Sequence, residues 1–593
     1  MTRRVLPAML FTAAGAAGCL SVPEGPAPMC HSTDDCDHDH GEVCDQGVCW
    51  GNPPPGPFAA VVSPPSMRPD LVSREIPQLA IPDMGWLGGL ALEAPVLFSG
   101  KLVAFCPPPL TTCDPTPLAG AVTVARDSQF HGGPGFHAVV AVAASDSFSI
   151  PMRRTQQGDP PYTVTIVPDT TRQAGARSAA EVVPPRRLQL SVTDNTATQP
   201  IELGGADLPT ISGTLVDTLG RGLANYRVSA LGRWDPSESP VEVSTVDFTD
   251  ATGAYAITLS DDLIGTVELV ARPVAAAIDA APPTAPAIHL AGIDATRAST
   301  QPAITLRDDL GAQTALPLQI VGLAQSGAVA GVSGAQVSIT GVASGSGPQT
   351  SYTIADQQIA DISGKVSLKV LGGAAFGGAY RVSITPPAGS TYSALYSQNP
   401  DALTSPVRLG PRLELHGHVV DGSDEPVANV SVTARPSLRF LWTLEAAQQV
   451  FAASIPAATT VTLATGEFIL WVDPSVAGTA GRYDLVFEPP TTMRAPSFTK
   501  PDVEIPQDMR GTFDLGDVAM PDAAFVHGQI TEPDAVTAVP DAELKLYQVS
   551  QIATEASLCS GLAHAPASCP IPAQLQARNA SENDGAVQLA LPR

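Results

Sequence analysis

The sequence predicts an all-β protein built as a tandem array of about five β-sandwich domains. Blocks of the form apolar–x–Gly recur about every 95 to 113 residues, and strictly alternating segments such as 223–230 and 427–434 follow them. Alternation with period two places one face of a strand in a core and the other in water. Turn residues recur at short intervals, which is typical of sandwiches. The repeated glycines are Gly100, Gly213, Gly322, Gly417 and Gly528.

Composition excludes several classes of protein before any motif is considered. The chain has 593 residues, of which 44% are hydrophobic and 15% are charged. That apolar content is enough for packed cores, which argues against a disordered chain. The formal net charge is −26, and nucleic acid is therefore not an expected partner, because phosphate binding requires clustered Lys and Arg. The length predicts several domains.

The N-terminus predicts export. A basic start, Met1–Arg4, precedes an uncharged apolar run over 5–17, which is too short to span a bilayer and fits a signal peptide over 1–18. The following Ala16-Ala17-Gly18-Cys19 resembles the lipobox of bacterial lipoproteins, with Ala16 where Leu is usual. The resemblance implies that Cys19 carries a lipid anchor in the bacterial outer membrane or cell surface. An ordinary secretory signal with an incidental cysteine is the alternative.

The remaining eight cysteines fall into local groups of even number, as disulfides of an exported protein do. Residues 19–50 hold four of them among His and Asp residues. Their spacing differs from that of most structural zinc sites, so we interpret the segment as a disulfide knot, with zinc as the alternative. It resembles small knots of bacterial surface lipoproteins. The candidate disulfide cysteines are Cys30, Cys36, Cys44, Cys49, Cys106, Cys113, Cys559 and Cys569.

Residues 51–83 are rich in proline, and we expect a semi-rigid extended linker that lifts the later domains away from a membrane. The five copies are expected to form sandwiches that share an opening strand, an alternating second strand, an Asp/Gly turn and a closing strand. The fifth ends before its closing strand, so either that domain is incomplete or the sequence ends early. The expected boundaries are 84–170, 201–275, 304–390, 408–492 and 512–593.

The combined pattern of these blocks resembles the carboxypeptidase regulatory-like, or transthyretin-like, domain. Residues 211–273 match it best and residues 415–487 nearly as well, and the other copies are weaker. The resemblance implies a seven-stranded Greek-key sandwich, an Ig-like architecture that is grouped with carbohydrate-binding-like folds. It implies no enzymatic activity of its own, because the domain is named after the metallocarboxypeptidases to which it is appended.

A search for chemistry predicts neither catalytic residues nor a metal or cofactor. No nucleophile elbow, His-Glu-x-x-His motif or phosphate loop occurs in the sequence. The pair His416 and His418 shares one face of a strand, but we interpret it as solvated, and His131 and His137 flank a glycine turn. The predicted function is a non-enzymatic surface scaffold or adhesion protein, shaped as a rod, with other surface proteins as partners. A glycan-binding protein that uses exposed aromatics, Trp234 above all, is the alternative.

Overall fold

The computed structural model describes most of the chain from Cys30 onward and confirms the all-β prediction. Strands dominate the described residues, and helices there are confined to short 3₁₀ turns and to α1 (Leu438–Leu441) and α2 (Ala446–Ser454). Among the described residues, no helix is long and apolar enough to cross a membrane. The described residues are 30–45, 48–105, 116–144, 146–169, 183–196, 198–205, 207–236, 238–274, 286–311, 313–324, 327–345, 349–373, 380–397, 406–490, 493, 495–506, 511–549 and 573–593.

The described residues form five β-sandwiches, which we number as modules 1 to 5 in chain order. Modules 1 and 2 each consist of two packed sheets. In module 1 the sheets have the orders β12-β6-β9 and β11-β10-β7-β8, and the first strand, β6, pairs in parallel with the last, β12. Module 1 comprises β6 (Val96–Ala104), β7 (Gly120–Arg126), β8 (Phe136–Val142), β9 (Phe148–Met152), β10 (Tyr162–Pro168), β11 (Arg186–Leu190) and β12 (Gln199–Leu203). Module 2 comprises β13 (Thr210–Val216), β14 (Tyr226–Gly232), β15 (Val241–Glu242), β16 (Asp247–Phe248), β17 (Ala254–Thr258), β18 (Thr266–Pro273), β19 (Ala287–Asp294), β20 (Ser299–Thr300) and β21 (Ile304–Thr305).

Modules 3 and 4 repeat this arrangement. The smaller sheet of module 4 has the order β38-β30-β33, and the corresponding sheet of module 3 has β22 paired with β26, β29 and the short strand β23. Module 3 comprises a 3₁₀ turn (Asp308–Leu310), β22 (Gln313–Leu323), β23 (Val329–Gly331), β24 (Gln336–Ser344), β25 (Thr350–Ile359), β26 (Lys365–Leu371), β27 (Tyr380–Thr385), β28 (Leu395–Ser397) and β29 (Val407–Leu409). Module 4 comprises β30 (Leu413–Val420), β31 (Ser431–Pro436), α1, α2, β32 (Ala458–Val461), β33 (Glu467–Val472), β34 (Ser475–Val476), β35 (Thr479–Ala480), β36 (Arg482–Glu488), β37 (Phe498–Glu504) and β38 (Thr512–Ala519).

The structure explains the repeated glycine of the opening strand. A Cβ atom at Gly213 would lie 2.5 Å from the hydroxyl of Tyr255, and one at Gly417 would lie 2.8 Å from the ring of Phe468. Both rings belong to the strand paired with the opening strand, so glycine leaves room for an aromatic side chain to lie across it. The motif seen in the sequence therefore records a packing requirement of the sandwich.

Several strands lie outside the sequence boundaries expected for the sandwiches. In modules 1 to 4 the last two strand positions follow the predicted end of the copy, as with β11 and β12 in module 1 and β37 and β38 in module 4. These segments alternate less regularly than the central strands. The alternation signal was therefore too weak to include them in the predicted domains.

The fifth module corrects two sequence predictions. Its own strands are β39 (Ala523–Thr531), β40 (Glu543–Gln548), β41 (Gln574–Ala580) and β42 (Ala586–Pro592). The three remaining positions are filled by β3 (Phe58–Ser63), β4 (Arg74–Leu79) and β5 (Trp86–Ala91). They form the sheets β4-β3-β40-β41 and β5-β39-β42.

The proline-rich segment 51–83 is therefore not an extended spacer, because β3 and β4 lie within it, and the fifth sandwich has its closing strand. Prolines are compatible with these strands because they lie mostly between them, as Pro64, Pro65 and Pro69 do. The missing strand was simply at the other end of the sequence.

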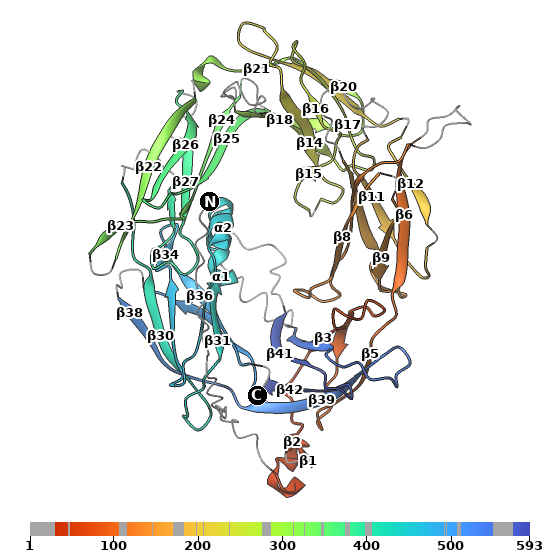
Figure 1. The fold of residues 1–593 in the computed structure, drawn as a ribbon, viewed down its shortest axis with the longest axis vertical. Coiled ribbons are helices and arrows are strands. Elements are labelled where there is room, and N and C mark those ends of the chain that lie inside the picture. The colour runs from red at the N-terminus through yellow and green to blue at the C-terminus, as the bar shows by residue number, and fades with distance from the viewer. Residues whose placement is uncertain are drawn as a thin grey trace, which may run out of the picture.

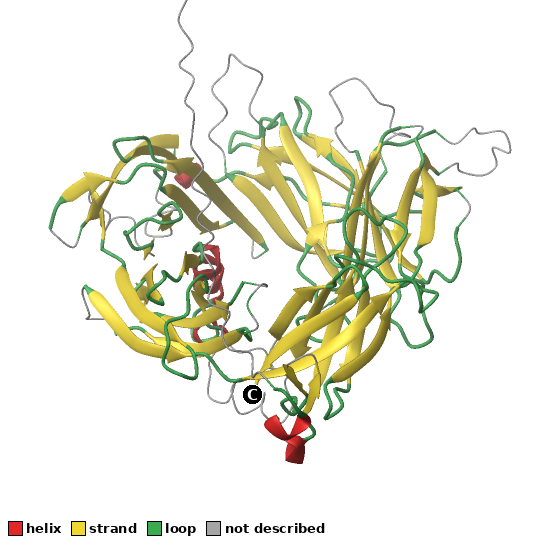
Figure 2. Ribbon diagram, turned by 60° about the horizontal axis from the view of Figure 1, so that its bottom comes forward, coloured by secondary structure: helices red, strands yellow, loops and turns green. Residues whose placement is uncertain are grey.

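The predicted rod is also wrong, because the modules follow one another around a ring (Figure 1). Modules 2 and 3 lie at the top of that view, and module 5 lies at the bottom between modules 4 and 1. Figure 2 shows the same ring tilted, with strands in every module. The ring closes because strands from near the N-terminus complete the C-terminal sandwich.

The N-terminal knot projects from the ring beside module 5 (Figure 1). It contains two 3₁₀ turns (Thr33–Asp35 and His38–His40) and the hairpin of β1 (Val43–Asp45) and β2 (Val48–Trp50). Strand β2 continues the sheet of β39 through the pair Trp50 and Phe525.

Candidate functional site

The boundary between modules 2 and 3 carries a side-chain constellation that spans two modules. Strand β19 of module 2 pairs antiparallel with β25 of module 3, which merges two sheets into one of nine strands. A single hydrophobic cluster also runs through both modules. The merged sheet holds side chains from different modules in a fixed register.

Three polar side chains form a chain across that boundary. His289 on β19 places Nδ1 2.7 Å from Oε1 of Glu268 on β18 and Nε2 2.8 Å from Oγ1 of Thr353 on β25. The imidazole side chain is 18% exposed, so it is largely shielded from water. Acid, imidazole and hydroxyl in this order can orient a base and activate a hydroxyl nucleophile.

The surroundings of Thr353 indicate that these side chains link modules 2 and 3 and do not form a catalytic site. Its backbone is paired with Ala287 on one side and with Val342 on the other. Backbone N–H groups in the middle of a sheet are engaged in the ladders, whereas acyl transfer needs free donors for an oxyanion. We therefore assign the Glu268–His289–Thr353 chain to the linkage of modules 2 and 3.

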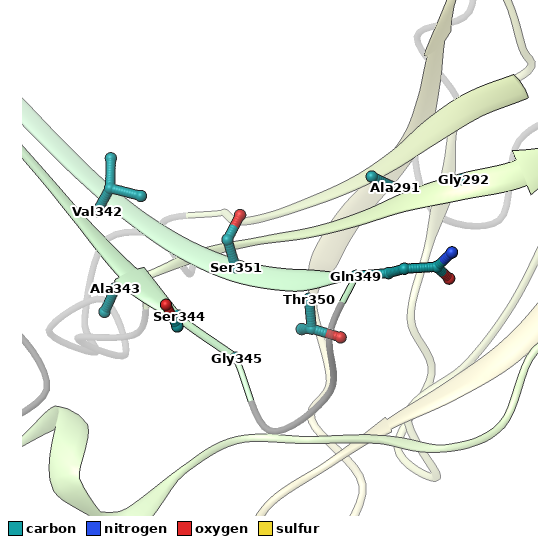
Figure 3. A pocket seen from close by; sticks show the side chains of 9 residues that line it. All are labelled: Ala291, Gly292, Val342, Ala343, Ser344, Gly345, Gln349, Thr350 and Ser351. Atoms are coloured by element: carbon teal, nitrogen blue, oxygen red, sulfur yellow. The ribbon is translucent and has the colours of Figure 1, made fainter.

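A shallow hollow lies on the same merged sheet (Figure 3). Its volume is about 680 Å³, and none of its lining side chains is charged. Hydroxyl and amide groups there could accept or donate hydrogen bonds but could not transfer a proton at neutral pH. The lining residues are Ala291, Gly292, Val342, Ala343, Ser344, Gly345, Gln349, Thr350 and Ser351.

Sequence reasoning missed this constellation altogether. His289 lies in a segment that was expected to connect two sandwiches, and Thr353 lies more than sixty residues further along the chain. Neither residue belongs to a motif. The two residues come together only because strands of different modules pair, and a single sequence contains no signal for that register.

The histidine pair of module 4 shares one face of β30, as the sequence predicted. His416 places Nε2 2.9 Å from Oε1 of Glu467 and Nδ1 3.7 Å from Oδ1 of Asp514. The ring of His418 meets it edge to face at 5.1 Å. The two carboxylates occupy opposite nitrogens of His416, so these groups do not converge on one point as metal ligands would.

Of the two histidines predicted beside a glycine turn, His131 lies where modules 1 and 5 meet. The carbonyl oxygen of His131 accepts a hydrogen bond of 2.8 Å from the backbone N–H of Ala573. The side chain of His137 is exposed on β8. The first residue thus serves the contact between modules.

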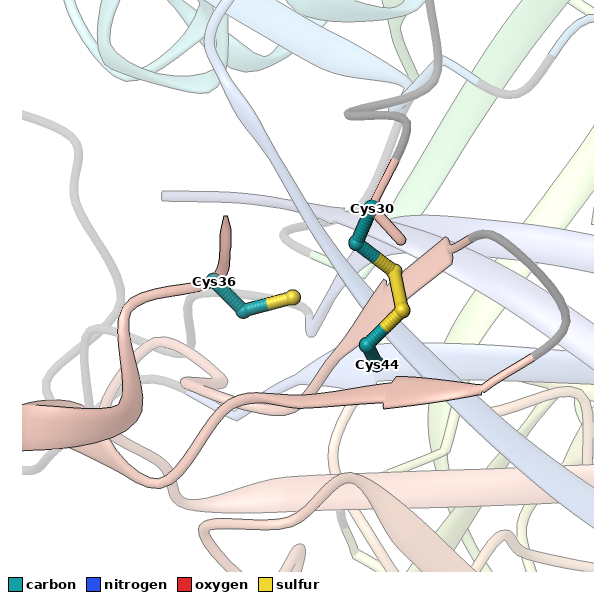
Figure 4. Close-up of side chains that lie close together, drawn as sticks. All are labelled: Cys30, Cys36 and Cys44. Atoms are coloured by element: carbon teal, nitrogen blue, oxygen red, sulfur yellow. A yellow bond between two sulfur atoms is a disulfide. The ribbon is translucent and has the colours of Figure 1, made fainter. Parts of the chain in front are cut away.

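The knot contains two disulfides, Cys30–Cys44 and Cys36–Cys49. Figure 4 shows the first of these bonds with Cys36 beside it. The sulfurs of Cys30, Cys36 and Cys44 are close enough together to be considered metal ligands, but all are paired in covalent bonds, which supports the disulfide interpretation over zinc. The lipidation candidate Cys19 and the cysteines Cys106, Cys113, Cys559 and Cys569 lie outside the described residues.

The knot is docked onto module 5 through an aromatic stack. His527 on β39 lies between Trp50 of the knot, at 4.5 Å, and Trp86 of β5, at 5.0 Å between ring centroids. Burial lowers the pKa of His527, and the nearby carboxylate of Asp45 partly opposes that shift. Glu42 of the knot also forms an ion pair with Arg593. These contacts join the two ends of the chain.

Trp234, the candidate sugar platform, lies at the boundary between modules 1 and 2. Its side chain is partly buried and packs against the core of module 2. Its indole N–H donates a hydrogen bond of 3.2 Å to the carbonyl of Asp261. The guanidinium of Arg187 lies 5.9 Å from the ring centroid, and that arginine also pairs with Glu238. Trp234 therefore contributes to the contact between these modules.

A buried ion pair organises the boundary between modules 3 and 4. Arg412 and Asp473 are 4% and 2% exposed, and Nη2 of the arginine lies 3.2 Å from Oδ2 of the aspartate. The backbone N–H of Ala394 in module 3 donates a hydrogen bond of 2.9 Å to Asp473. Desolvation raises the pKa of Asp473, although Arg412 acts in the opposite direction. The pair positions a loop of module 3 against module 4.

Comparison with known proteins gives no family for this chain. No family model matches it, and no curated protein sequence matches it. Solved structures with local similarity include bacterial pilins and an adhesin. A streptococcal ancillary pilin is 11% identical, covering 53% of this chain and 99% of its own, with a TM-score of 0.18.

Two further solved structures also have low sequence identity and low TM-scores. The shaft pilin SpaA of Lactobacillus rhamnosus GG is 12% identical, covering 36% of this chain and 97% of its own, with a TM-score of 0.15. Two B repeat units of the collagen-binding protein of Staphylococcus aureus are 10% identical, covering 66% and 92%, with a TM-score of 0.12. At these TM-scores the molecules do not superpose as wholes, so the similarity assigns no function to this chain.

Proposed function

We propose that this protein is an exported, lipid-anchored and non-enzymatic surface scaffold with a role in adhesion. The observation that carries the proposal is the ring itself, in which packed or hydrogen-bonded groups join modules 1 and 2, 2 and 3, 3 and 4, and 5 and 1 among the described residues. The polar constellation of modules 2 and 3 is engaged in such a boundary. A rigid arrangement of sandwiches is suited to present surfaces at defined positions.

The location of the knot supports an orientation on a membrane. Cys19 precedes Cys30 by a short segment, so a lipid on Cys19 would attach the molecule at the knot. The knot lies beside module 5, and modules 2 and 3 lie at the opposite end of the ring (Figure 1). Modules 2 and 3 would then face away from the membrane. The ring, and not an extended stalk, would set their height.

The charge of the chain is consistent with a protein displayed in solution around a cell. A net charge of −26 keeps such a surface hydrated and discourages nonspecific association. A partner would have to bind against this charge or carry basic groups. The scaffold is therefore expected to select partners by local surface complementarity.

Display of the full-length chain on a bacterium that lacks it tests the proposal. We expect mass spectrometry of the membrane extract to find a mature chain that begins at an acylated Cys19, and Cys19→Ala to release the folded protein. Cells that display the protein should adhere to glycan-coated or protein-coated surfaces, and cells producing the released variant should not. An unmodified Cys19 in the membrane extract, or equal adhesion of both cell types, would overturn the proposal.

A further inference from the structure

We propose that residues 58–91 can be exchanged between copies of this chain, so that the segment of one copy completes module 5 of another. We call this segment the clasp; it contains β3, β4 and β5. Exchange would link molecules head to tail at the point where each ring now closes on itself. This self-association is separate from the proposed anchoring and adhesion.

The contact between the clasp and module 5 is extensive and apolar. All six residues of β3 pair with β40, and β5 runs parallel to β39. One hydrophobic cluster contains Phe58, Val62 and Leu90 of the clasp together with Leu544 and Leu589 of module 5. Module 5 without a clasp would expose this core and the unpaired edges of β39 and β40, which attract a matching segment.

The contact between the clasp and module 1 is a separate one. The carboxylate of Glu75 on β4 accepts hydrogen bonds of 3.0 Å from the backbone N–H groups of Gln129 and Gly135 in module 1. Glu93, just after β5, lies 3.5 Å from Arg153 of module 1. Only residues 92–95 connect the clasp to β6. The clasp would therefore move together with module 1.

Exchange would preserve the contacts of the clasp with module 5 and its contacts with module 1. In the closed ring, clasp and module 5 belong to the same copy, whereas in a linked form they would belong to neighbouring copies. Swapping an identical element in this way is an inexpensive route to oligomers, and a head-to-tail contact gives larger rings or open filaments. Closed and linked forms then differ mainly in effective concentration and in the strain of closing the ring.

The position of the exchange site follows from the chain order. In modules 1 to 4, the described strands of each sandwich come from one continuous stretch of sequence. In module 5, the paired residues Val62 and Leu544 come from opposite ends of the chain. Ring closure is therefore the one step among the described modules that a second copy can perform equally well.

Pairs of introduced cysteines test the exchange, because Ser63 and Glu543 lie directly opposite each other across β3 and β40. A full-length chain with both Ser63→Cys and Glu543→Cys should form an internal disulfide. Chains with one substitution each, refolded together, should form a covalent heterodimer on denaturing gels only if a clasp enters another copy. Its yield should rise with concentration, because intramolecular closure competes at an effective concentration of about the millimolar range.

The matched control mixes Ser63→Cys with Thr193→Cys, which is exposed in module 1. We expect roughly tenfold more heterodimer from the opposed pair than from this control at the highest concentration. Equal yields from both mixtures, with complete internal crosslinking of the double variant, would overturn the proposal. If the first pair impairs folding, Gly89→Cys and Gln529→Cys across β5 and β39 replace it, because a Cβ at Gly89 meets no atom within 4 Å. Neither outcome depends on the lipid anchor.

Discussion

Two connections in this ring are made by strands, and they differ in where the strands come from. Modules 2 and 3 share a sheet through β19 and β25, which lie in consecutive modules, and they share one hydrophobic core. Module 5 and module 1 are joined through the clasp, whose strands pair with residues near the other end of the chain. The first connection is local and the second closes the whole ring.

This difference predicts that the connection through the clasp is less stable than the one between modules 2 and 3. Closing a longer loop costs more conformational entropy, although the cost grows only with the logarithm of the length. Module 5 has a complete core only when a clasp is in place, so in a single closed molecule ring closure and the folding of module 5 are one event. By contrast, modules 2 and 3 each have a full set of strands from their own part of the sequence, and the pairing of β19 with β25 is additional.

A charge in the clasp should have the largest effect. Val62 is completely buried in the core of module 5, so Val62→Asp places an unpaired carboxylate there and should destabilise that module by about 4 kcal/mol or more. Calorimetry should show module 5 melting early while modules 2 and 3 keep their transition. Ser63→Asp, at a half-buried neighbouring position, is the control. An unchanged melting profile in Val62→Asp would contradict the pairing of β3 with β40.

The boundary between modules 3 and 4 provides an intermediate case. Asp473→Ala leaves Arg412 buried without its partner, and breaking a buried pair costs about 3–5 kcal/mol. We expect lower stability of module 4 and faster hydrogen exchange at Ala394, with module 5 unaffected. Replacement of the exposed Asp194, which lies 3.7 Å from Arg154, by Ala serves as the comparison, and it should change stability by well under about 1 kcal/mol. Equal effects of both substitutions would show that burial does not govern the pair.

Removing the hydroxyl from the polar chain of modules 2 and 3 should have a smaller effect. Thr353→Val keeps the shape of the side chain but removes the hydrogen bond to His289, at a cost of about 1 kcal/mol. Because the merged sheet remains, hydrogen exchange at β19 should accelerate only slightly. A full separation of the two modules in small-angle scattering would mean that the side chains, and not the strand pairing, hold this boundary.

Mild acid should loosen the clasp. Burial holds the pKa of His527 below its ordinary value of 6.5, so the unfolded chain binds a proton more readily than the folded one. Stability from this group is complete at neutral and higher pH and decreases as the pH falls through 6.5 toward the lower folded pKa. The melting temperature of module 5 should decrease modestly over that interval. In His527→Gln this decrease in the melting temperature of module 5 should be absent. The same pH dependence in the variant would exclude His527 as the cause of the decrease.

Much of the module architecture was predictable from the sequence because local rules carry it. Alternation in segments such as 427–434 marks the central strands, and the glycine of the opening strand marks a position where an aromatic side chain crosses. The turn before β17 of module 2 was predictable for the same reason. Asp250 accepts backbone hydrogen bonds from Thr252 and Ala254, and Gly253 has a φ of 78°, a left-handed conformation that suits glycine.

Contacts between modules were beyond the reach of one sequence. The stack of Trp50, His527 and Trp86 joins three segments that no local pattern connects, and His289 meets Thr353 only through pairing between modules. A strand records in its own residues which face is buried, but not which distant strand it pairs with. The pairing partner is chosen by the packing of the complete core.

The sequence by itself determined that this protein is all-β and repetitive, with a cysteine-rich segment before the repeats. Tertiary structure decided that the proline-rich segment supplies strands, that the fifth sandwich has its closing strand, and that the array is a ring. The physical reason is the same in each case. Alternation and turns depend on neighbouring residues, whereas completing module 5 requires apolar faces from both ends of the chain to be buried together.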